Sequence, residues 1–219
     1  MNTFTATANS ASTIGYVWYG STEWAVGSTE GACQGAYHGT TASQSRVGLM
    51  LFNGAGAALK GKVIQSITLT ITCSGAGSGS SGKVLSFRRA NVQALDKTLR
   101  GSAQVGAALG TLTGTFYANT TTHTLSASSN AAFFAALCAY LTEGNSALVL
   151  YNGETSESNS YSANYARVTA CTLTVSYSDG TVHYRTGGAW KQCTVWVRVN
   201  GAWKQCAPYY RKDGAWVRV

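Results

Sequence analysis

The stretch Val63-Ile64-Gln65-Ser66-Ile67-Thr68-Leu69-Thr70-Ile71-Thr72-Cys73 decides the fold class of this 219-residue chain. Its large apolar residues alternate with threonines, and a period of two is that of a strand with one buried face. The threonines predict an outer face lined with hydroxyl groups. Further strands are predicted at 14–19, 46–52, 83–90, 111–117, 121–126, 147–151 and 171–177, with loops and short strands over 20–45.

A helix interrupts this series of strands at 131–143. Phe133, Leu137 and Leu141 recur four residues apart, which is the period of one helical face. Ser128 to Asn130 are expected to cap its start, and Gly144 its end. Many short strands with one helix predict an all-β protein, and specifically a jelly-roll β-sandwich over residues 1–180.

The last 39 residues contain a repeat with a step of 13. Gly-Ala-Trp recurs at 188–190, 201–203 and 214–216. Gly187-Gly188, Asn200-Gly201 and Asp213-Gly214 are typical two-residue hairpin turns, so residues 181–219 are predicted to form a C-terminal antiparallel β-meander of repeated hairpins. The residues expected to share one interaction face are Arg185, Trp190, Trp196, Arg198, Trp203, Arg211, Trp216 and Arg218.

The opposite face of this meander is apolar. Its residues are Val195, Val197, Val199, Val217, Cys193 and Cys206. A thin sheet with one apolar side is marginal in water, so this face is expected to pack on the sandwich, on another copy or on another protein. A contact with another molecule is the favoured interpretation, and a chain without residues 181–219 is then expected to stay folded but to lose assembly.

Charge is sparse and unevenly placed. Charged residues make up 11% of the chain, about half the usual share. The net charge is +8, and residues 181–219 alone hold seven basic residues and one acidic residue. The basic residues alternate with apolar ones and no nucleic-acid motif accompanies them, so nucleic acid is not an expected partner. They are expected to keep the exposed sheet edges soluble.

Catalytic and metal-binding patterns are weak. His38, His123 and His183 are far apart, and the six cysteines have no metal-ligand spacing and are expected to be free thiols. Residues 77–83 match most of a phosphate-binding loop, but Val84 follows where Ser or Thr is needed, so a hairpin loop is expected. A carboxylate pair drawn from Glu23, Glu30, Glu154 and Glu157 stays open as an alternative. The prediction is a non-enzyme without metal or cofactor.

Aromatic residues crowd two predicted loop regions. The faces of such rings pack well against sugar rings. The candidates for glycan binding are Tyr16, Trp18, Tyr19, Trp24, Tyr37, Tyr161 and Tyr165. The alternative for Tyr16 and Trp18 is ordinary packing in the sandwich.

The order of segments resembles a known module. The segments are Arg46-Val-Gly-Leu-Met-Leu-Phe52, then Leu59-Lys-Gly-Lys-Val-Ile-Gln-Ser-Ile-Thr-Leu-Thr-Ile71, the helix, Ala147-Leu-Val-Leu-Tyr151, and Tyr161-Ser-Ala-Asn-Tyr-Ala-Arg167. This order is similar to the DNRLRE-type jelly-roll modules of bacterial surface proteins and phage structural proteins, over residues 3–178. The resemblance implies binding or scaffolding rather than catalysis.

The tail carries a second resemblance. Arg198-Val-Asn-Gly-Ala-Trp-Lys204 is similar to the C-terminal hairpin repeats of phage tail and minor structural proteins, and distantly to choline-binding cell-wall repeats.

These features together predict a non-enzymatic structural protein of a bacteriophage virion that serves attachment, as a tail fibre or tip or as head decoration. Its expected partners are other virion proteins, a host cell-surface polysaccharide and further copies of itself, with no membrane insertion. The N-terminus, Met1 to Phe4, shows no signal peptide, so the expected location is the virion, after synthesis in the host cytoplasm. The alternative is a bacterial cell-surface carbohydrate-binding module.

Overall fold

The computed structural model describes residues 1–8, 12–18, 25–28, 31–38, 43–75, 83–96, 101–153, 165–179, 182–193, 195–206, 209–212 and 215–218. The body holds eleven strands: β1 (Asn2–Ala8), β2 (Ser12–Trp18), β3 (Ala25–Ser28), β4 (Ala32–His38), β5 (Ser43–Leu51), β6 (Val63–Cys73), β7 (Lys83–Ala90), β8 (Val105–Gly114), β9 (Thr120–Leu125), β10 (Ala147–Leu150) and β11 (Ala166–Ser178). Its helices are α1 (Ala55–Leu59), α2 (Gly101–Gln104) and α3 (Ala131–Thr142).

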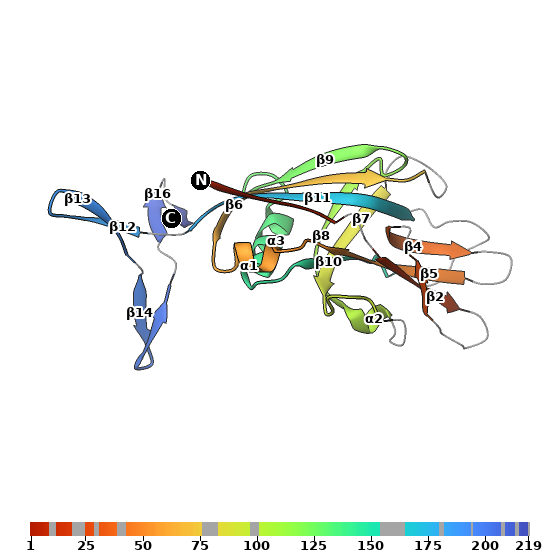
Figure 1. The fold of residues 1–219 in the computed structure, drawn as a ribbon, viewed down its shortest axis with the longest axis horizontal. Helices are drawn as coiled ribbons and strands as arrows, with labels where there is room; N and C mark the ends of the chain where they lie inside the picture. Colours follow the sequence, from red (N-terminus) through yellow and green to blue (C-terminus); the bar gives the residue numbers. More distant parts are fainter. Residues whose placement is uncertain are drawn as a thin grey trace.

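Two antiparallel layers form a β-sandwich, as predicted. One layer has the order β9-β6-β11, with β1 and β4 both paired to the free side of β11. The other has the order β8-β7-β10-β5, extended by β2 and β3. In Figure 1 the first layer arches over the second. From β5 to β6 and β7, and from β8 to β9, β10 and β11, the chain passes repeatedly from one layer to the other.

Strand β4 joins the two layers because it changes partner part-way. Residues 32–34 pair with β11, and residues 35–38 pair with β5. Gly35 sits at the change with φ 88°, a backbone conformation that favours glycine. Next to it, the fully buried amide of Gln34 donates from Nε2 to the Val84 carbonyl at 2.6 Å and accepts from the Ser86 N–H at 2.8 Å. Gln34 therefore binds the edge of β7 beyond the end of β10.

The main core lies between the layers. The alternation that predicted β6 is seen directly: Ile67, Leu69 and Ile71 are buried and pack with Leu173 and Val175 of β11 in one cluster. Strand β10 is buried on both faces, because a second, smaller apolar cluster lies on its other side. That cluster contains Val47, Leu49, Ala147 and Val149.

Helix α3 closes the core from one side, and Phe87 of β7 meets its Phe133 with ring centroids 5.2 Å apart. The helix spans 131–142, close to the prediction, and Gly144 (φ 103°) ends it. Asn130 occupies the N-cap, within the predicted range, but in a left-handed conformation and without a side-chain hydrogen bond to the helix. Ser126 and Ser129 form a tight turn immediately before it.

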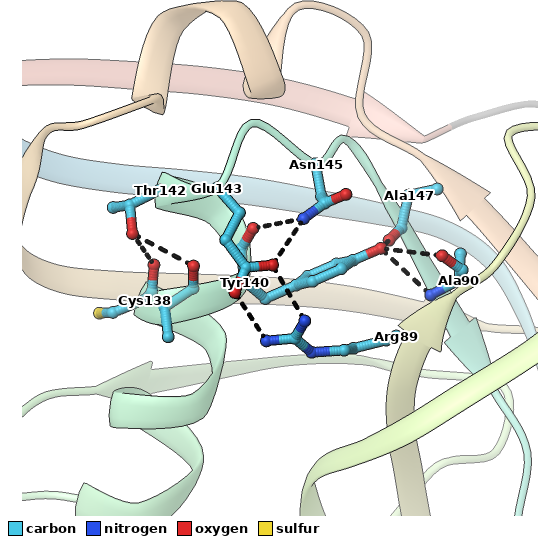
Figure 2. A network of polar contacts seen from close by, with 9 residues as sticks. Arg89, Ala90, Cys138, Tyr140, Thr142, Glu143, Asn145 and Ala147 are labelled. Atoms are coloured by element: carbon cyan, nitrogen blue, oxygen red, sulfur yellow. Dashed lines mark hydrogen bonds and ion pairs between the residues drawn. The ribbon is translucent and has the colours of Figure 1, made fainter.

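A network of polar contacts ties the end of α3 to β7 and β10 (Figure 2). The Tyr140 hydroxyl accepts from the Ala90 N–H at 3.1 Å and donates to the Ala147 carbonyl at 2.8 Å. The Arg89 guanidinium lies over the Tyr140 ring, 5.1 Å from its centroid, and binds the Glu143 carboxylate through two bonds of 2.9 and 3.0 Å. The Tyr140 hydroxyl thus adds one more polar bridge where the β7–β10 ladder ends.

The outer face of the first layer carries the predicted hydroxyl groups in register. Two rows run across β9, β6, β11 and β1, and every position in them is a threonine. The rows are Thr124-Thr68-Thr174-Thr5 and Thr122-Thr70-Thr172-Thr7. Hydroxyl oxygens lie 3.3 Å apart between Thr70 and Thr122, and 2.8 Å apart between Thr7 and Thr172.

Candidate functional site: the C-terminal hairpins

Three hairpins follow the body: β12 (Val182–Thr186) with β13 (Ala189–Cys193), β14 (Trp196–Val199) with β15 (Ala202–Gln205), and β16 (Tyr209–Lys212) with β17 (Ala215–Arg218). Figure 1 shows them gathered beyond the end of the body that also holds the N-terminus. Each repeat of the sequence is therefore one supersecondary unit.

Local backbone chemistry explains the turns. Gly187 and Gly188 have φ 59° and 80°, and Asn200 and Gly201 have φ 50° and 80°. Positive φ at both central residues is the requirement of a type I′ turn, which Gly-Gly and Asn-Gly meet readily. Both turns were predicted; the third, Asp213-Gly214, lies outside the described residues.

In each hairpin the register sets an arginine opposite a tryptophan. The pairs are Arg185 with Trp190, Arg198 with Trp203, and Arg211 with Trp216. Trp196 lies two residues before Arg198, so the two share one face of their hairpin. Arg218 lies two residues after Trp216, so these two also share a face. The pairing across the turns is confirmed, and the use of these residues for interaction stays a prediction.

One part of the tail prediction needs correction. The hairpins form three separate two-stranded sheets, and no described strand of one pairs with a strand of the next, so the meander is not continuous. In the sequence, neither connection carries a two-residue turn signal of the kind seen within the hairpins: Thr194 and Val195 are β-branched, and Pro208 has no N–H to donate.

Hairpin β14–β15 is exposed on both faces. Trp203 and Trp196 keep 66% and 54% of their surface accessible, and on the other face Val197 and Val199 keep 42% and 39%. The Arg198 Nε donates to the Gly201 carbonyl at 3.3 Å, which holds the guanidinium near the turn. Val197 and Val199 are therefore not buried against the body.

The described structure places four of the seven predicted glycan-binding aromatics. Tyr165 is 5% exposed and buried beside β11, so it is not a surface platform, and this part of the prediction is wrong. Tyr16, Trp18 and Tyr37 lie on β2 and β4. In the register, Tyr16 lies opposite Ser45 and Trp18 opposite Ser43, so these two positions share one face of the sheet. Tyr37 lies opposite Gln44, a position of the other face. The remaining candidates, Tyr19, Trp24 and Tyr161, lie outside the described residues.

A buried polar cluster lies at the start of β7 instead. Lys83 is 1% exposed, donates from Nζ to the Tyr165 carbonyl, and lies 5.9 Å from the centroid of the Tyr117 ring. Burial lowers the pKa of Lys83 and raises the pKa of the neighbouring Cys73 thiol to about 11. Lys83, the lysine of the segment that resembles a phosphate-binding loop, is therefore bonded to the protein's own backbone. The strand predicted at 83–90 is confirmed.

Cys73 and Cys171 are thiols of the main core. Cys33, Cys73, Cys138, Cys171 and Cys206 are in no disulfide, as expected, and the side chain of Cys193 lies outside the described part. Burial raises the pKa of Cys171 to about 12, so the group stays protonated at neutral pH. Thiols in this state are poor nucleophiles and poor metal ligands.

Two of the three acidic residues that the structure describes form ion pairs. Glu143 binds Arg89, and Asp179 binds the Lys62 ammonium at 2.7 Å, which lowers the pKa of Asp179. Asp96 is held through its backbone by the Gln104 amide. The four glutamates of the alternative carboxylate pair (Glu23, Glu30, Glu154 and Glu157) lie outside the described residues.

His123 faces Thr121 and Phe116, and burial lowers its pKa. Within the described ranges there is no group of three or more metal-binding side chains, and no helix is long and apolar enough to cross a membrane.

An open groove runs between α3 and the start of β6. Ile64, Phe134 and Cys138 line it, and Lys62 lies at one side with its ammonium held by Asp179. This lining offers apolar contact and no acid–base pair among the described residues.

No family model matches the chain, and no curated protein matches it significantly. The resemblance to DNRLRE-type modules therefore stays a prediction from segment order.

Proposed function

We propose that this chain is a non-enzymatic structural protein of a bacteriophage virion, in which the sandwich is a stable body and the C-terminal hairpins make the attachment. The observation that carries this proposal is the hairpin β14–β15, which exposes two tryptophans and two valines to solvent. Large apolar side chains grouped on an exposed element mark an interaction surface.

The sandwich supports a scaffolding role. Gln34, Lys83 and Gln104 are fully buried polar side chains, and their hydrogen bonds are made to backbone groups of the fold. Buried polar groups satisfied in this way specify one rigid structure. Among the described carboxylates, those of Glu143 and Asp179 are likewise engaged in ion pairs, with Arg89 and Lys62.

Immunogold labelling tests this proposal. Antibody raised against residues 1–180 should decorate purified particles of the virus that encodes the chain, at tail or head. Label on the bacterial envelope in cells without virus would favour the alternative, a cell-surface carbohydrate-binding module. Protein found only in the soluble fraction, with bare particles, would contradict a structural role.

A further inference from the structure

The hairpin β14–β15 presents an aromatic and cationic face. Trp196, Arg198 and Trp203 are all exposed and lie on the same face of the hairpin, because Arg198 pairs with Trp203 and Trp196 is two residues before Arg198. Arg198 uses its Nε for the Gly201 carbonyl, and its two Nη groups have no hydrogen-bond partner among the described residues. Lys204 lies in the alternate row, opposite Val197. The face therefore offers two indole rings with one guanidinium between them.

The charge of the tail restricts what can occupy this face. Residues 181–219 carry seven basic residues and one acidic residue, and the rest of the chain is also slightly basic. A second copy of the same face would bring like charges together, which opposes association. Charge complementarity instead requires an anionic partner.

The density of charge favours a polysaccharide over a nucleic acid. A nucleic-acid strand carries one negative charge per about 3.4 Å, and proteins that bind it neutralise these charges with closely spaced Lys and Arg side chains. Here a single guanidinium stands on the aromatic face, and the next arginine of the series is 13 residues away in another hairpin. This spacing suits a polymer in which a charged unit alternates with a neutral ring.

We infer that hairpin β14–β15 binds an anionic cell-surface polysaccharide through Trp196, Arg198 and Trp203, and that the Arg185–Trp190 and Arg211–Trp216 pairs, set opposite each other by the same register, form the linked sites of the other two hairpins. The indole faces pack on the apolar faces of the sugar rings, and the guanidinium forms charge-assisted hydrogen bonds with a carboxylate. The inference rests on the proposed attachment function and adds a second partner to it: the aromatic face takes the polysaccharide, and the valine face of the same hairpin is left for the contact with the particle. Because the three sites are linked in one chain, binding at one site raises the effective concentration of the polymer at the other two. Weak contacts at single sites therefore give a much stronger total affinity.

Binding of the full chain to immobilised hyaluronan, which has one carboxylate per disaccharide, tests the inference. Biolayer interferometry should show binding that weakens as salt rises. Trp203→Ala and Arg198→Gln should each lower the affinity about tenfold, because loss of one of three linked sites reduces avidity. Val199→Ala, on the opposite face of the same hairpin, should change the affinity less than twofold. All three variant sites are exposed, so the body should stay folded.

Three results would overturn the inference. They are absence of binding to both hyaluronan and polygalacturonate at low salt, equal binding to neutral dextran, and equal losses from Val199→Ala and Trp203→Ala. Tighter binding to single-stranded DNA, with the same dependence on Arg198 and Trp203, would also overturn it and assign the face to nucleic acid. If particles are labelled by the antibody while hyaluronan fails, only this inference falls and attachment stands.

Discussion

At the scale of single residues, the Gln34 amide connects β4 to β7, two strands that do not pair with each other. Its two bonds satisfy the Val84 carbonyl and the Ser86 N–H on the edge of β7. Gln34→Leu keeps the volume roughly constant but leaves both backbone groups without these bonds. We expect the free energy of unfolding to fall by about 2–4 kcal/mol, measured by urea denaturation. Gln65→Leu, at an exposed site of β6, is the control, and an equal loss there would contradict the role of Gln34.

Tyr140 makes the second such prediction. Tyr140→Phe keeps the ring under Arg89 but removes the hydroxyl that bridges Ala90 and Ala147. We expect a loss of about 1–3 kcal/mol, since two backbone groups lose a partner where water has little access. Thermal denaturation measures it, with Tyr177→Phe on β11 as the matched control. A change no larger than that of the control would mean that the hydroxyl bridge adds nothing to stability.

The buried thiols predict how stability depends on pH. The pKa of Cys171 is raised from 9.0 to about 12 and that of Cys73 from 9.0 to about 11. The unfolded chain therefore loses these protons first as pH rises. The stabilisation is complete below pH 9 and is lost progressively above it, at about 1.4 kcal/mol per pH unit for each thiol.

Cys171→Ala should remove one thiol from this dependence. Urea denaturation between pH 9 and pH 11 should give a slope shallower than that of the unaltered chain by about 1.4 kcal/mol per pH unit. Val175→Ala, at a buried position of the same strand that has no titratable group, should leave the slope as it is. Identical slopes for Cys171→Ala and the unaltered chain would show that Cys171 ionises in the folded state.

At the scale of elements, regular patterns were predictable and changes of partner were not. Strand β6, with its Thr/apolar alternation, and helix α3, with its four-residue spacing, were predicted within a residue of their bounds. Strand β1 was missed because threonine and alanine dominate it, and its pairing with β11 comes from long-range contact. The switch of β4 at Gly35 was also missed, since a single glycine in a polar segment fits many conformations.

For the candidate site as well, local features were predictable from the sequence and long-range features were not. The Arg–Trp pairs across the hairpins followed from the turn residues, because a two-residue turn fixes the register. The separation of the hairpins into three sheets depends on the connections, where no turn signal is present. The buried positions of Gln34, Lys83 and Tyr165 come from layers far apart in sequence, and no local pattern distinguishes them from exposed polar or aromatic residues.

The turn of the second hairpin gives the prediction at this scale. Gly201 has φ 80°, which a β-branched residue adopts only at a cost of about 1–3 kcal/mol. An isolated hairpin is marginal in water, so Gly201→Val should unfold it. NMR should lose the cross-strand contacts between Arg198 and Trp203 while the signals of the body remain. Ala202→Val, at the next position in extended backbone, should keep these contacts; their loss there as well would mean that added bulk, not the turn, is responsible.

At the scale of the whole molecule, the chain combines two kinds of stability. The body buries a continuous core between two layers, joined by β4 and closed by α3. The tail consists of small hairpins, and β14–β15, the one whose side chains are largely described, keeps its tryptophans and valines exposed. The body therefore should not need the tail to fold, whereas the tail gains its function from what it contacts.

The most direct test of this account is a comparison of the full chain with residues 1–180 alone, expressed during infection by a virus that lacks its own copy. We expect the melting temperature of the body to change by less than about 2 °C, equivalent to less than about 1 kcal/mol. We also expect the full chain, but not residues 1–180, to be recovered in purified particles. If residues 1–180 unfold, or if they enter particles as well as the full chain does, the hairpins are not the attachment element and the central claim is wrong.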